Sequence, residues 1–164
     1  MEWIKQFIRL IALMLIQVLI LNQLQFFGIC HPYVFILFIL MMPISLPRQV
    51  ELVVAAVVGL IMDLFCNSLG IHMAACVLIA FLRRVMIRNI VMDDTRLMGE
   101  INSISLGRLG FFKYAAVLIL IYHTMAVMLT AWSFANVGLN ILQILLSSLL
   151  CGLMIIGYDV LKSK

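Results

Sequence analysis

Two ionisable side chains, Asp63 and His123, fall within apolar stretches of the sequence, where they could hold a polar group or transfer a proton. An ionisable residue at the centre of a bilayer costs about 2.5–3.5 kcal/mol on insertion scales, so it needs a partner. Proton transfer by His123 would require an acid or a second histidine at the same depth, and the sequence places neither beside it. We therefore interpret His123 as a neutral, hydrogen-bonded residue that packs against another helix of this chain or of a partner.

Asp63 precedes the polar pair Asn67-Ser68, near the predicted outer end of a helix. A carboxylate there can attract the free backbone N–H groups at the start of the next helix, where Asn67 or Ser68 would form the cap. This structural role is our interpretation of Asp63. Contact with a partner or ligand, and proton transfer, stay open as alternatives.

The remaining histidines and cysteines form no pattern typical of a catalytic or metal centre. His31 and His72 are expected at helix ends, without a cluster of acidic or cysteine residues at zinc-ligand spacing. Cys30 and Cys66 are expected near the same membrane face, so a disulfide between them stays open. The sequence contains no nucleophile and base arrangement, glycine-rich phosphate loop or carboxylate pair. We expect no enzymatic activity, no metal and no cofactor.

Six apolar stretches would position these residues, and they are typical of helices that cross a membrane. They cover residues 8–21, 32–46, 50–65, 69–82, 111–131 and 137–161. The chain is 66% hydrophobic and 11% charged, whereas soluble domains carry about 25% charged residues. The sequence predicts an all-α integral membrane protein, a compact bundle of six transmembrane helices that forms a single domain over residues 1–164. No cleavable signal peptide is expected, because no small-residue cleavage site follows the first stretch.

The eleven Lys and Arg residues alternate along the chain with connections that lack them. Segments 1–9, 47–51, 83–113 and 162–164 contain all of them, and connections 22–31, 66–70 and 132–136 contain none. Because basic residues stay on the cytoplasmic side, both termini and a basic loop at about 83–110 are predicted to be cytoplasmic. Asp94 or Thr95 could cap a short helix in this loop, and a simple connector is the alternative. The basic residues assigned to the loop and its border are Arg83, Arg84, Arg88, Arg96, Arg108 and Lys113.

The second stretch, 32–46, is short for a membrane-spanning helix. At about 1.5 Å per residue it would not reach across a hydrocarbon core of about 30 Å, so a re-entrant segment is an alternative. If it did not cross, the basic loop would face outward, against the positive-inside rule. Charge therefore favours a crossing, in which Pro43 kinks the inner end and Pro47 ends the helix.

Small residues mark expected contacts between helices. The spacing that lets helix backbones approach closely is found at Ala55 and Gly59 in the third stretch, and at Ser147, Ser148, Cys151 and Gly152 in the sixth. We interpret these positions as internal packing, with contact to a partner as the alternative. The net charge of +4 does not indicate nucleic-acid binding, because the basic residues border apolar stretches as membrane anchors do.

Several motifs resemble those of a known family. They are the stretch 59–70, which contains Asp63 and ends in Leu69-Gly70, the sequence LGFFKY at 109–114, Tyr122-His123, the sequence WSF at 132–134, and Ser147-Ser148. With the predicted topology, they are similar to the rod shape-determining protein MreD family of bacteria over nearly the whole chain. The resemblance implies a multi-pass, non-enzymatic subunit of the cell-elongation machinery in the inner membrane, which helps direct lateral peptidoglycan synthesis.

The same resemblance implies partners. They are the single-span membrane protein MreC, the actin-like MreB filament, a glycan polymerase and transpeptidase pair, and membrane lipids, and a homodimer stays open. It also implies a fold like that of the six-helix substrate-binding components of energy-coupling vitamin transporters, which makes such a component the alternative function. Those components usually carry an Ala-xxx-Ala pair on the first helix, whereas Ala12 is followed by Ile16. They also need a polar and aromatic cluster at the outer end, and the sequence shows none, although it offers His31, Tyr33, His72 and Trp132.

Overall fold

The computed structural model describes residues 2–23, 31–90, 101, 103–131 and 136–162, and the chain is helical with no strand in these ranges. In chain order the elements are α1 (Glu2–Ile16), a π-helical turn η1 (Gln17–Leu21), α2 (Ile36–Leu40), α3 (Arg48–Cys66), α4 (Ile71–Ile90), α5 (Ser103–Leu106), α6 (Arg108–Thr130) and α7 (Val137–Lys162). The predicted all-α fold is thus confirmed.

Three helices in the described part of the chain are long and apolar enough to cross a membrane. They are α3, α6 and the portion of α7 from Val137 to Asp159. Their bounds agree closely with three of the predicted apolar stretches, because an uninterrupted run of apolar residues without proline satisfies its own backbone only as a helix. The count of six spans stays a prediction.

The inner segment, residues 31–47, differs from the helix predicted over 32–46. Only α2 is helical, and the backbone on either side of it is irregular. Residues 35–41 are each at most 6% exposed, so the segment runs through the interior of the bundle. Irregular backbone is tolerated where protein surrounds it, and this burial meets that condition. A helix kink was predicted near Pro43. In the structure α2 ends at Leu40, before this proline.

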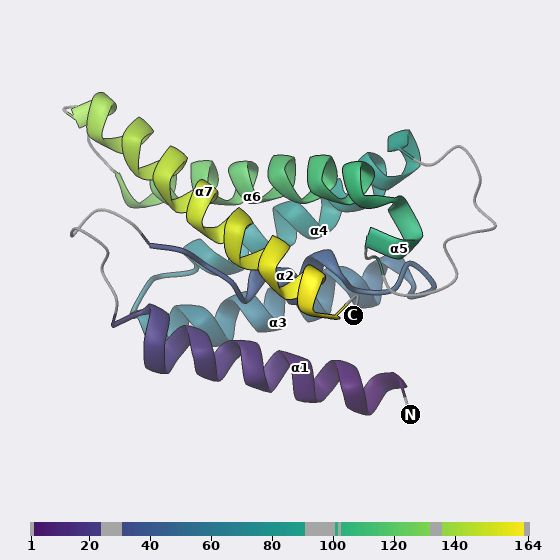
Figure 1. Cartoon of the computed structure of the whole chain (residues 1–164). Coiled ribbons are helices and arrows are strands. Elements are labelled where there is room, and N and C mark those ends of the chain that lie inside the picture. The colour runs from purple at the N-terminus through teal and green to yellow at the C-terminus, as the bar shows by residue number, and fades with distance from the viewer. Residues whose placement is uncertain (1, 24–30, 91–100, 102, 132–135, 163–164) are drawn as a thin grey trace.

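Helices α3, α4, α6 and α7 pack side by side in that order, and α1 contacts the bundle chiefly through α2. Figure 1 shows α7 crossing in front of α6 and α2, with α1 along one side. The start of α1 and the end of α7 lie at the same end of the bundle, near α5 (Figure 1). At the opposite end α3 turns into α4, and we call this the α3–α4 end.

The basic loop begins later than predicted. Helix α4 continues to Ile90 because its residues 83–90 keep packing apolar side chains, such as the buried Ile87, against the bundle. The residues Arg83, Arg84 and Arg88 therefore lie in α4, Arg108 and Lys113 lie in α6, and Arg96 lies outside the described residues. The proposed caps Asp94 and Thr95 also fall outside them, and the short helix α5 follows.

Candidate functional site

Asp63 joins the end of α3 to the start of α4. Its carboxylate accepts hydrogen bonds from the backbone N–H groups of His72 and Met73, both at 2.9 Å, and from the Ser68 hydroxyl at 2.6 Å. These amides have no partner within their own helix, and a negative charge at a helix N-terminus is favourable. The predicted structural role of Asp63 is confirmed, although the carboxylate itself provides the cap.

The turn between α3 and α4 depends on two residues with positive φ. Asn67 ends α3 at φ 52° and Gly70 precedes α4 at φ 80°. Asparagine and glycine tolerate this left-handed region better than other residues. Gly70, one of the candidate contact residues, therefore shapes the corner that brings the α4 amides to Asp63.

Gly59 forms a close contact between α3 and α4. A Cβ atom added to Gly59 would lie 2.5 Å from the Cα of Met73 and 2.7 Å from the carbonyl oxygen of His72. Ala55 is fully buried in the same bundle. Both residues therefore pack inside the bundle, as we interpreted from their spacing. A larger residue at Gly59 would disturb folding and would not probe a partner surface.

Side chains of neighbouring helices satisfy the backbone of the inner segment at the α3–α4 end. Gln17 accepts from the N–H of Val34 at 2.8 Å and donates to the carbonyl of Pro32 at 3.1 Å. From α7, Ser147 accepts from the N–H of His31 at 3.1 Å, and Cys151 donates to the carbonyl of Tyr33 at 3.3 Å. These bonds replace those that a regular helix would make.

An ion-pair network binds the other end of the inner segment. Arg83 is fully buried, pairs with Glu51 of α3 and donates to the carbonyl of Met42. Tyr114 of α6 accepts from Arg83 at 3.3 Å and donates to the carbonyl of Leu40 at 3.0 Å. Two carbonyl groups of the inner segment thus accept hydrogen bonds from side chains of α4 and α6.

Arg84 completes this network from the edge of the bundle. Its Nε lies 2.7 Å from the second oxygen of Glu51, and its guanidinium donates to the carbonyl of Leu46. Two guanidinium groups therefore share one buried carboxylate and several carbonyl dipoles. These residues hold α3, α4 and the inner segment together. This role was not predicted when Arg83 and Arg84 were assigned to the cytoplasmic basic loop and its border.

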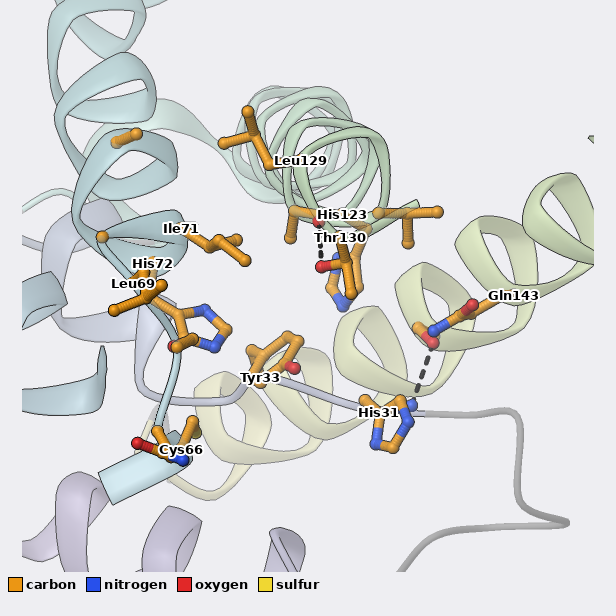
Figure 2. Close-up of a pocket in the computed structure, with 17 residues that line it drawn as sticks. His31, Tyr33, Cys66, Leu69, Ile71, His72, His123, Leu129, Thr130 and Gln143 are labelled. Carbon is orange, nitrogen blue, oxygen red and sulfur yellow. Dashed lines mark hydrogen bonds between the residues drawn. The ribbon is translucent and has the colours of Figure 1, made fainter. Parts of the chain in front are cut away.

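All three histidines of the chain line one cavity at the α3–α4 end. The cavity measures about 700 Å³, and His31, His72 and His123 enter it from the inner segment, α4 and α6. Tyr33 and Gln143 also line it, and Figure 2 shows these labelled side chains around the same space. The polar and aromatic cluster that was not visible in the sequence is thus formed, and Trp132 lies outside the described residues.

The rings inside this histidine cavity are held by defined contacts. The Tyr122 hydroxyl hydrogen-bonds Nδ1 of His72 at 2.6 Å, and the two rings stack. Nδ1 of His123 lies 2.9 Å from the carbonyl oxygen of Ile119, so this nitrogen carries the proton. The centroid of the Tyr33 ring lies 4.7 Å from that of His72 and 5.7 Å from that of His123. The predicted neutral, hydrogen-bonded role of His123 agrees with this geometry.

No metal site is formed in the part of the chain that the structure describes: it holds no group of three His, Cys, Asp or Glu side chains arranged for a metal ion. Cys66, Cys76 and Cys151 are free thiols, and Cys30 lies outside the described residues, which leaves the disulfide prediction untested. Ser148 donates to the carbonyl of Leu145 within its own helix at 3.0 Å.

A lateral groove opens between α1 and α3 on the side of the bundle. It measures about 350 Å³, and Phe38 and Met42 of the inner segment contribute to its lining. The α1 side consists of Gln6, Phe7 and Leu10, and the α3 side of Val50, Val53, Val54, Val57, Val58 and Ile61. The α3 positions recur at helical spacing, so they form one stripe along the helix.

Comparison with protein-family models, with curated proteins and with solved structures finds no match for this chain. The lateral groove and the histidine cavity are the features of the structure that bear on function. The valine stripe was present in the sequence as a helical repeat and could have been recognised there. Neither the histidine cavity nor the Glu51 network could be recognised from a local sequence pattern, because each consists of residues from several helices.

Proposed function

We propose that this chain is a non-enzymatic scaffold of the bacterial inner membrane, similar to the MreD proteins, in which α1, the inner segment, α3, α4, α6 and α7 each cross the membrane. In this proposal it binds a single-span, MreC-like protein through the lateral groove. It thereby helps to connect the cytoplasmic elongation machinery with the enzymes that build lateral peptidoglycan.

The observation that carries this proposal is the apolar groove between α1 and α3 on the side of the bundle. Its α3 stripe extends from Val50 to Ile61, which at about 1.5 Å per residue corresponds to about 16 Å along the helix. The stripe consists of valine side chains up to its last residue, and within a bilayer such an apolar surface associates with a second helix through van der Waals packing. A transmembrane helix is therefore the partner whose shape and polarity suit this groove.

The inner segment supports the same proposal because it keeps one wall of the groove rigid. Phe38 and Met42 are at most 6% exposed, and the Met42 carbonyl accepts from Arg83. A groove whose wall is fixed loses little conformational entropy when a partner helix enters it. The basic ends of α4 and α6 would meet the cytoplasmic partners.

Site-specific crosslinking in native membranes tests the proposal. A photoreactive phenylalanine analogue replaces Val57, which lines the groove and is 50% exposed, or Leu60, which is 48% exposed and does not line it. We expect the Val57 position to yield a covalent product with one single-span membrane protein, identified by mass spectrometry, and the Leu60 position to yield far less. Equal products from both positions would contradict the use of the groove.

A pull-down of the tagged protein in mild detergent provides the complementary test. Enrichment of an MreC-like protein together with cell-wall synthesis enzymes is the expected result, and Val57→Trp should reduce it while Leu60→Trp should not. A product between two copies of this chain would indicate a homodimer at the groove instead. Enrichment of a coupling membrane subunit with paired ATPases would overturn the scaffold proposal and favour the vitamin-transporter component.

A further inference from the structure

The histidine cavity contains a buried polar atom that the described part of the chain leaves unpaired. His123 is 2% exposed, and its Nε2 has no hydrogen-bond partner there, although the backbone of His31 approaches the ring. Because Nδ1 donates to the Ile119 carbonyl, Nε2 of the neutral ring is a lone pair that can only accept. A buried acceptor without a donor is unfavourable, so the site favours a molecule that brings an O–H or N–H group.

Other groups around the cavity can complete such a contact. The Tyr33 hydroxyl and the Gln143 amide line it, and neither forms a side-chain hydrogen bond with the described residues. Both are neutral and can donate as well as accept. These two groups and His123 come from the inner segment, α7 and α6, so they surround the space from three elements (Figure 2).

The composition of the lining defines the charge and shape of a suitable ligand. None of the lining residues in the described chain is a Lys, Arg, Asp or Glu. Tyr33 and His72 add aromatic edges to the lining, and Ile71, Val127 and Leu129 add apolar surface. A volume of about 700 Å³ falls within the range of about 300–1,000 Å³ that is typical of small-molecule sites.

We propose that the histidine cavity binds a neutral, hydroxyl-bearing ring, of which a sugar is the simplest case, with one hydroxyl donating to Nε2 of His123. The ring is either a soluble molecule or the headgroup of a neutral glycolipid in the adjacent leaflet. The site is separate from the lateral groove, so it neither requires nor excludes the scaffold function.

Histidine-selective nitrogen NMR tests this site directly, because the chain contains only three histidines. The protein, purified with a histidine-free tag, is placed in dioleoyl phosphatidylcholine nanodiscs. Methyl β-glucoside is then titrated in, or β-glucosyl dioleoylglycerol is included in the disc. The Nε2 signal of His123, identified by its absence in His123→Asn, should shift saturably as it accepts a hydrogen bond.

Two variants keep the test independent of folding. Gln143→Ala removes a lining amide and should weaken binding by about three- to tenfold, the effect of one hydrogen bond. Gln49→Ala removes an exposed amide that does not line the cavity and should leave binding unchanged. A shift with the soluble glucoside indicates a solute site, and a shift only with the glycolipid indicates a headgroup site. If neither probe shifts the signal, or if Gln143→Ala binds as wild type, the proposal is wrong.

Discussion

Replacing Glu51 with leucine should destabilise the fold more than replacing either of its arginine partners. Arg83 is fully buried and Glu51 is 1% exposed, so loss of the carboxylate leaves a buried guanidinium with only neutral acceptors. Breaking a buried ion pair from one side costs about 3–5 kcal/mol, because the remaining charge stays desolvated. We expect the free energy of unfolding of Glu51→Leu to fall by that amount.

The same network predicts that the effects of two substitutions do not add. In Arg83→Met, Glu51 keeps its 2.7 Å contact with Arg84, so the loss should be smaller, about 1.5–3 kcal/mol for hydrogen bonds that involve a charged group. With both side chains replaced, no unpaired charge remains in the interior, and Arg84 is 31% exposed and can turn toward solvent. The double variant should therefore be no less stable than Glu51→Leu alone.

Reversible unfolding in dodecyl maltoside micelles, induced by sodium dodecyl sulfate and followed by circular dichroism, measures these differences. Arg88→Met is the matched control, because Arg88 is exposed on the same helix as Arg83 and should change stability by no more than about 0.5 kcal/mol. If Glu51→Leu costs no more than this control, or if the Glu51 and Arg83 effects simply add, the buried pair does not hold the inner segment as argued.

Three further outcomes follow from the α3–α4 end of the bundle. Gly59→Ala should lower the free energy of unfolding by about 1–3 kcal/mol, because the added methyl group forces α3 away from α4. Gly152→Ala is the control: its added Cβ meets nothing within 4 Å, so it should be neutral or stabilise α7 by up to about 1 kcal/mol. The same unfolding assay compares the two variants. Asp63→Ala should cost about 1–3 kcal/mol by leaving the first α4 amides without a cap, and faster amide hydrogen exchange confined to the start of α4 would identify that cause. Burial lowers the pKa of the His31 imidazole from its ordinary 6.5, so the unfolded chain binds a proton more readily. Stability should therefore fall as the pH decreases below 6.5, and this fall should be shallower in His31→Gln.

The long helices were predictable because the signal for each lies within its own stretch of sequence. Uninterrupted apolar runs predicted α3, α6 and α7, and the residue types at the α3–α4 corner predicted that Asp63 would meet free amides. The fourth apolar stretch was predicted to end at about Leu82, with Arg83 and Arg84 at the border of the cytoplasmic basic loop, whereas α4 ends at Ile90. A buried arginine is compatible with the interior only beside a carboxylate, and Glu51 lies 32 positions earlier in the chain.

The irregular inner segment illustrates the limit of sequence patterns. Its composition is as apolar as that of a spanning helix, and Pro32, Pro43 and Pro47 mark only its borders. Its backbone is compatible with the interior because side chains of other helices provide the missing hydrogen bonds. The bond between the His31 N–H and Ser147 joins residues 116 positions apart, and no local periodicity carries that information.

By itself, therefore, the sequence determined the all-helical class, three helices of membrane-spanning length, the structural role of Asp63 and the small-residue contact at Gly59. These properties depend on hydrophobic runs and on residues close in the sequence: Asp63 lies nine and ten positions before His72 and Met73, and Gly59 lies 14 positions before Met73. Tertiary structure alone decided that three histidines share one cavity, that Glu51 joins two arginines and that α1 and α3 leave a groove between them. Each of these features arises where separate helices meet, and the free energy of such contacts depends on distances that only packing sets.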